Sequence, residues 1–80
     1  MKYKQYSVVR LKEIKKQFTE SESYLGTRLP KVGDIATIVE IYESPTLGYE
    51  LECENKDGSA NWLLTFSPED AIFELISESA

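Results

Sequence analysis

The sequence predicts a single small domain of the all-β class. Its 80 residues are enough for one domain with a modest core, which we expect to span about residues 6–76. A hydrophobic content of 41% and nine aromatic side chains indicate a folded chain. Five segments rich in β-branched and aromatic residues are separated by Gly, Pro, Asn and Asp, which is typical of strands joined by turns.

The first strand is predicted at residues 6–11, because Tyr-Ser-Val-Val-Arg-Leu favours extended structure. Leu11, Ile14 and Phe18 then follow at helical spacing, which predicts a short amphipathic turn of helix. Residues 12–31 as a whole form a long basic loop in this interpretation. A loop of this length in so small a domain is usually functional or mobile.

The strongest strand signal lies at residues 35–42, where the sequence is almost continuously apolar. This character indicates a long, bent strand that serves two faces of a closed sheet. Residues 49–54 alternate strictly, so that Tyr49, Leu51 and Cys53 are predicted to face the core.

Residues 55–58 (Asn-Lys-Asp-Gly) predict a tight hairpin turn into a strand at residues 60–66. Ser67, Pro68 and Asp70 form a helix-start signature, from which we expect one short 3₁₀ turn before a last strand at residues 72–76. This order of elements is that of an SH3-like small barrel of about five antiparallel strands with a long first loop.

Charge is segregated along the chain. Residues 1–31 hold eight basic and three acidic side chains, a net charge of +5, whereas residues 32–80 hold one and eleven, a net charge of −10. A field of one sign selects partners of the opposite sign. The acidic balance argues against general nucleic-acid binding, which depends on neutralising phosphates.

Enzyme chemistry is not indicated. The chain has no histidine to act as a base, and its one cysteine, Cys53, falls on the predicted core face of its strand. We therefore expect no catalytic residues, no cofactor and no metal site. A free thiol without an export signal or membrane span predicts a cytoplasmic protein.

The most informative polar residues are three glutamates on the outer face of one strand, Glu50, Glu52 and Glu54. Pairing Val39 with Leu51 and Ile41 with Tyr49 would place Glu40 opposite Glu50. Like charges opposite one another destabilise a sheet. Such a row is either a solvated face that aids solubility, a docking surface for a basic protein, or a loose Ca²⁺ site without the usual loop spacing.

The aromatic residues divide into core and surface candidates. Trp62 shares the predicted face of Leu51 and is expected in the core. Tyr42, at the outer end of the bent strand, and Tyr24, in the long loop, are better candidates for partner contact. The Ala-Leu-Tyr-Asp-Tyr run of SH3 domains that bind proline-rich peptides is missing, so this activity is not expected.

The chain resembles a bacterial family of uncharacterised small proteins. The resemblance rests on Gly33-Asp34-Ile35-Ala36-Thr37-Ile38-Val39-Glu40-Ile41-Tyr42, then Gly48-Tyr49-Glu50-Leu51-Glu52, then Asp57-Gly58. It covers about residues 7–76, with Ala36 where the family usually has Gly and a longer, more basic first loop. It implies an SH3-like fold without enzyme activity, and some members belong to toxin–antitoxin or toxin–immunity gene pairs.

These observations lead to one main hypothesis and two alternatives. The main hypothesis is a non-enzymatic module that docks a basic protein, such as a toxin domain, on an acidic barrel face, with the most concrete form an immunity protein or antitoxin. One alternative is an accessory subunit of a larger complex. The other is a nucleic-acid-binding barrel that uses the basic flank of Lys2, Lys4, Arg10, Lys12, Lys15 and Lys16. The main hypothesis assigns partner binding to Glu40, Tyr42, Glu50, Glu52 and Glu54.

Overall fold

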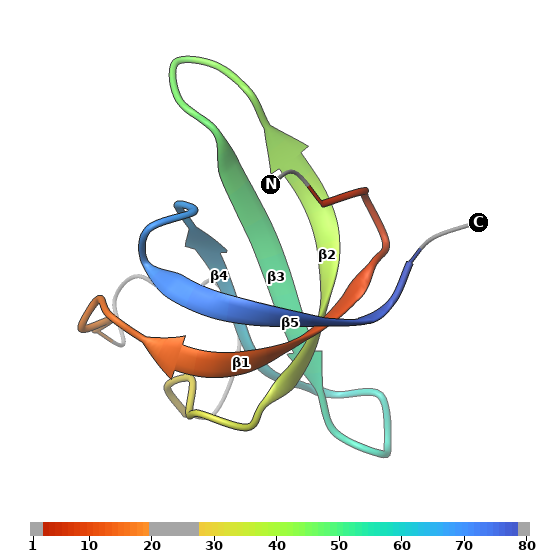
Figure 1. The fold of residues 1–80 in the computed structure, drawn as a ribbon. Helices are drawn as coiled ribbons and strands as arrows, with labels where there is room; N and C mark the ends of the chain where they lie inside the picture. Colours follow the sequence, from red (N-terminus) through yellow and green to blue (C-terminus); the bar gives the residue numbers. More distant parts are fainter. Residues whose placement is uncertain (1–2, 20–27, 79–80) are drawn as a thin grey trace.

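The computed structural model describes residues 3–19 and 28–78, which form one antiparallel sheet of five strands (Figure 1). The order of the strands across the sheet is β4-β3-β2-β1-β5, and no helix occurs in the described residues. The strands are β1 (Val8–Ile14), β2 (Ile35–Tyr42), β3 (Gly48–Glu54), β4 (Ala60–Phe66) and β5 (Ala71–Ser77). The all-β prediction is therefore confirmed.

The sheet coils so that β1 and β5 cross over β2, β3 and β4 (Figure 1). In the described residues β4 and β5 do not pair, so the sheet is not closed. Aromatic rings fill the space between the two halves: Phe66 lies 4.6 Å from Phe18 and 5.8 Å from both Trp62 and Phe73, centroid to centroid. The buried apolar residues are Val9, Leu11, Phe18, Ala36, Ile38, Tyr49, Leu51, Cys53, Trp62, Leu64, Phe66 and Ala71.

The predicted turn of helix after residue 11 is wrong, and β1 runs on to Ile14 instead. The cause is a bulge: Leu11 pairs with Phe73 and Glu13 with Ile72, which leaves Lys12 as an extra residue. A bulge reverses the alternation of a strand, so Leu11 and Ile14 both pack against the core although they are three residues apart. The spacing that suggested a helix thus belongs to a bulged strand.

The predicted single turn before the last strand is present, and it is closed by the i to i+3 hydrogen bond that is typical of a 3₁₀ turn. The Ser67 backbone N–H donates to Asp70 Oδ2 at 2.9 Å, and the Asp70 N–H donates to the Ser67 carbonyl at 3.0 Å. The chain makes one such turn and enters β5 at Ala71. The Asp70 carbonyl cannot continue a helix because it accepts the backbone N–H groups of Lys15 and Lys16.

The Asp34 carboxylate joins the end of the first loop to the core. It accepts two hydrogen bonds from the Arg28 guanidinium, at 2.8 and 2.9 Å, and one from the Lys31 backbone N–H at 2.8 Å. The indole N–H of the fully buried Trp62 donates to it at 2.9 Å. Gly33 allows the tight turn that presents this carboxylate, because its φ of 98° suits glycine.

Two opposing effects set the ionisation of Asp34. Burial alone would raise its pKa, but the hydrogen bonds from Arg28, Lys31 and Trp62 outweigh burial and lower the pKa below the usual value. A carboxylate with a lowered pKa stabilises the fold above its unfolded-state pKa, and this contribution is lost as the pH falls through the folded-state pKa.

Replacing Asp34 by Asn should lower the free energy of unfolding at pH 7 by about 2 kcal/mol, a typical value for partly buried charge-assisted hydrogen bonds. In a domain of this size the melting temperature would fall by roughly 10 °C. The difference from wild type should shrink as the pH drops below the ordinary Asp pKa of 3.8. Urea unfolding from pH 7 to acid measures it, with the exposed Glu69→Gln as control; equal loss in both variants would contradict the assignment.

Candidate functional site

The acidic face is the outer surface of β2 and β3 that carries Glu40, Tyr42, Glu50, Glu52 and Glu54. The predicted pairs Ile41–Tyr49 and Glu40–Glu50 are confirmed, but Leu51 pairs with Ile38 rather than Val39. Val39 is instead an extra residue in a bulge, and its carbonyl accepts the Gln5 side-chain amide at 2.9 Å. Because Ile38 is buried, strict alternation would turn Glu40 inward, and the bulge turns it outward.

Tyr42 belongs to the acidic face by contact as well as by position. Its hydroxyl lies 3.2 Å from Glu50 Oε1, to which it donates a hydrogen bond, and the residue is 44% exposed. Glu40 is exposed, and its Oε1 accepts the Ile41 backbone N–H. On the other side of β3, Thr65 lies opposite Glu50 and Leu63 opposite Glu52. The face therefore offers carboxylates, one aromatic ring and uncharged neighbours.

The glutamates of this face oppose one another's ionisation. Partial burial raises the pKa of Glu52, and the neighbouring Glu54 raises it further by hydrogen bonding and by charge repulsion. Glu40 lies directly opposite Glu50 across the β2–β3 ladder, where two like charges are also unfavourable. The free protein therefore holds these negative charges together at a cost in stability.

The basic side chains of the described residues do not offset this face. Their ion pairs join Lys4 to Glu78 at 3.1 Å, Arg10 to Glu74 at 2.9 Å and Arg28 to Asp34 at 2.8 Å. The Lys16 ammonium lies over the Phe18 ring, 4.9 Å from its centroid. The basic flank is thus partly neutralised by acids of the C-terminal segment, while Lys2 and Tyr24 lie outside the described residues.

The structure confirms both core predictions made for single residues. Cys53 is 4% exposed, and burial raises the pKa of its thiol, so the nucleophilic thiolate is disfavoured. Trp62 is fully buried, and its one polar atom donates to Asp34 as described above.

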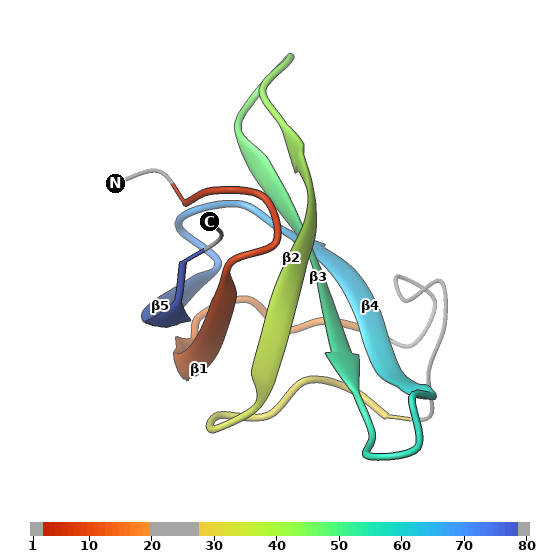
Figure 2. The same cartoon turned by 90° about the vertical axis from the view of Figure 1, so that its right-hand side faces the viewer.

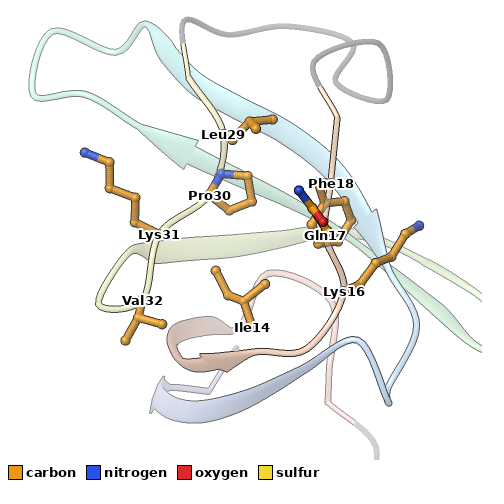
Figure 3. A pocket seen from close by; sticks show the side chains of 8 residues that line it. All are labelled: Ile14, Lys16, Gln17, Phe18, Leu29, Pro30, Lys31 and Val32. Atoms are coloured by element: carbon orange, nitrogen blue, oxygen red, sulfur yellow. The ribbon is translucent and has the colours of Figure 1, made fainter.

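A groove lies apart from the acidic face, between the end of β1 and the segment that leads into β2 (Figure 3). It has a volume of about 270 Å³. Ile14, Phe18, Leu29, Pro30 and Val32 give it an apolar lining, whereas Lys16 and Lys31 lie at its opposite sides and Gln17 completes it. The ionisable side chains of this lining are those of Lys16 and Lys31.

Residues 3–19 and 28–78 contain neither a cluster of metal ligands nor a helix that could span a membrane. No three Cys, Asp or Glu side chains in them gather closely enough to hold a metal ion. They contain no helix with the length and apolar character needed to cross a bilayer.

Comparison with known proteins does not place the chain in a family, because no family model, curated protein or solved structure matches it. The resemblance to small bacterial proteins described above therefore stays a prediction.

The cluster of Arg28, Asp34 and Trp62 was not predicted from the sequence. Its only local signal was an aspartate directly after the turn glycine Gly33. Arg28 lies within the predicted loop, and nothing in its sequence neighbourhood shows that it reaches the other side of the turn. The cluster is structural in character, because its charges and hydrogen-bonding groups satisfy one another.

Replacing Glu52 by Gln should stabilise the protein at pH 7. An acid whose folded-state pKa is raised favours folding most below its unfolded-state pKa of about 4.5, and this advantage is lost as the pH rises through the raised value. The variant should therefore gain over wild type only above that window. Unfolding experiments over the same pH range measure this gain. NMR titration of the Glu52 carboxyl group in the wild type and in Glu54→Gln then measures the coupling between the two glutamates. A Glu52 pKa that does not fall in Glu54→Gln would disprove the coupling.

Proposed function

We propose that this chain is an SH3-like, non-enzymatic module that binds a basic protein through the acidic face. The fold proposal is supported by the five antiparallel strands in the order β4-β3-β2-β1-β5 and by the long connection between β1 and β2. Cytoplasmic location and the absence of catalysis belong to the same proposal, supported by the buried, protonated Cys53 thiol.

The observation that carries the proposal is the uncompensated charge of the acidic face. Its four glutamates receive no lysine or arginine from the described residues, and Glu52 and Glu54 repel each other. A partner that brings lysine or arginine to this face would relieve the repulsion on binding. Charge complementarity of this kind speeds association and excludes acidic competitors. Tyr42 adds a ring face suited to a guanidinium or ammonium group.

The most concrete form of the proposal is an immunity protein or antitoxin that covers a nuclease-type toxin. An enzyme that binds nucleic acid needs a basic surface to contact phosphates. The acidic face would occupy that surface and block substrate by steric and electrostatic exclusion. The chain resembles small bacterial proteins of which some are encoded in toxin–antitoxin or toxin–immunity gene pairs, and this resemblance supports the same proposal.

The test is a titration of the protein with the product of the adjacent gene, at low and at physiological salt. Glu50→Lys combined with Glu52→Lys should weaken binding at least about a hundredfold, because two attractive contacts become repulsive. Glu13→Lys combined with Glu69→Lys changes the net charge equally on exposed residues away from the face and should leave affinity almost unchanged.

Unchanged binding in the Glu50→Lys, Glu52→Lys variant would sink the acidic-face model. A parallel titration with single-stranded RNA at about 50 mM salt, where phosphate contacts are strongest, separates the alternative. Tight RNA binding that is lost on replacing Lys12 and Lys15 would favour the nucleic-acid function instead.

A further inference from the structure

We propose that the groove between the end of β1 and the segment leading into β2 binds a short peptide segment of a partner protein, in which apolar side chains lie between acidic residues. The lining comes from residues 14–18 and 29–32, and these two segments run alongside each other (orange and yellow in Figure 2). The acidic face takes no part in this site, so the inference is independent of the proposed function.

The first wall of the groove is held in place by contacts to β5 and β4. The backbone N–H groups of Lys15 and Lys16 donate to the Asp70 carbonyl, at 2.7 and 3.1 Å, at the point where β5 begins. The Phe18 ring packs against Phe66 of β4, 4.6 Å from centroid to centroid. The backbone and the ring that form this side of the groove are therefore fixed before any ligand arrives.

The second wall is held by the Asp34 carboxylate. It accepts two hydrogen bonds from the Arg28 guanidinium and one from the Lys31 backbone N–H, which fixes both ends of residues 28–31. The Gly33 N–H also donates to the Leu11 carbonyl of β1 at 2.7 Å. Binding to a site with two ordered walls costs little conformational entropy of the protein.

The lining of the groove calls for an apolar group. Ile14, Leu29 and Pro30 are half-buried, and Val32 is 64% exposed. The volume of about 270 Å³ is just below the usual range of about 300–1,000 Å³ for pockets of drug-sized ligands, so it suits side chains of a peptide better than a larger ligand. Phe18 is only 6% exposed, so its ring offers no open face on which a nucleic-acid base could stack.

The charge of the groove selects an acidic partner. Lys16 and Lys31 lie at its opposite sides, and the described residues that line it include no acid (Figure 3). The Lys16 ammonium lies 4.9 Å from the centroid of the Phe18 ring, and the Lys31 ammonium pairs with no carboxylate of residues 3–19 and 28–78. A ligand with one anionic end would meet one lysine, whereas a peptide with acids on both sides of its apolar residues can meet both.

The test uses the full chain and a synthetic peptide, acetyl-Glu-Glu-Leu-Leu-Glu-Glu-amide, at about 50 mM salt, where ionic contacts are weakly screened. Amide NMR chemical shifts should change at residues 14–18 and 29–32 and stay constant on the acidic face. Replacing the glutamates of the peptide by glutamine and replacing its leucines by serine should each weaken binding at least about tenfold, because the first removes the ionic contacts and the second the apolar contacts.

Lys16→Glu combined with Lys31→Glu should weaken binding of the peptide at least about tenfold, and it keeps the backbone hydrogen bond from residue 31 to Asp34. Lys4→Glu combined with Lys56→Glu is the matched control, because it changes the net charge equally on exposed residues that do not line the groove. This control should bind the peptide like the wild type, and circular dichroism checks that every variant is folded.

The inference is overturned if the peptide causes no shift changes at the groove, if the glutamine or serine peptide binds as tightly, or if the groove variant binds like the control. Decanoate and oligouridine are titrated in parallel, and both should bind the groove more weakly than the peptide. Tighter binding of decanoate would instead assign the groove to a free amphipathic acid, and tighter binding of oligouridine would assign it to RNA.

Discussion

The Asp34 carboxylate is where the first loop, the start of β2 and the core of the sheet meet. It accepts hydrogen bonds from Arg28 and from the Lys31 backbone N–H in the loop, and from the indole N–H of Trp62 in β4. The backbone carbonyl of Asp34 accepts the N–H of Leu11 in β1. A long loop has a large conformational entropy to lose. The Asp34 side chain ties the end of the loop to β4, and its backbone carbonyl ties it to β1, directly before β2 begins at Ile35.

Two bulges then decide which side chains each face receives. The extra residue Lys12 in β1 lets Ile14 join Leu11 against the core, and the extra residue Val39 in β2 turns Glu40 and Tyr42 outward beside Glu50. The acidic face is thus assembled by backbone geometry, and a sheet without the second bulge would separate these residues. Its carboxylates are close enough to repel, whereas three cations of the described residues, Lys4, Arg10 and Arg28, are paired with other acids.

The molecule consequently has two halves with different chemistry. The β2–β3 half concentrates negative charge, which favours basic partners and repels another copy. In the β1–β5 half the charges sum to zero, and its last strand exposes Ile72, Leu75 and Ile76. The uneven charge of the sequence therefore becomes, in the fold, a division between two surfaces rather than between two ends of a chain.

The sequence by itself determined the β class, four of the five strands to within one residue, the burial of Cys53 and Trp62, and the Glu40–Glu50 pair, because alternation and turn residues act locally. Only the tertiary structure decided the length of β1, the point at which the turn before β5 stops, the two bulges and the Arg28–Asp34–Trp62 cluster. Each depends on a partner distant in sequence: β5 draws out β1, Lys15 and Lys16 occupy the Asp70 carbonyl, and Trp62 reaches Asp34 across 28 residues.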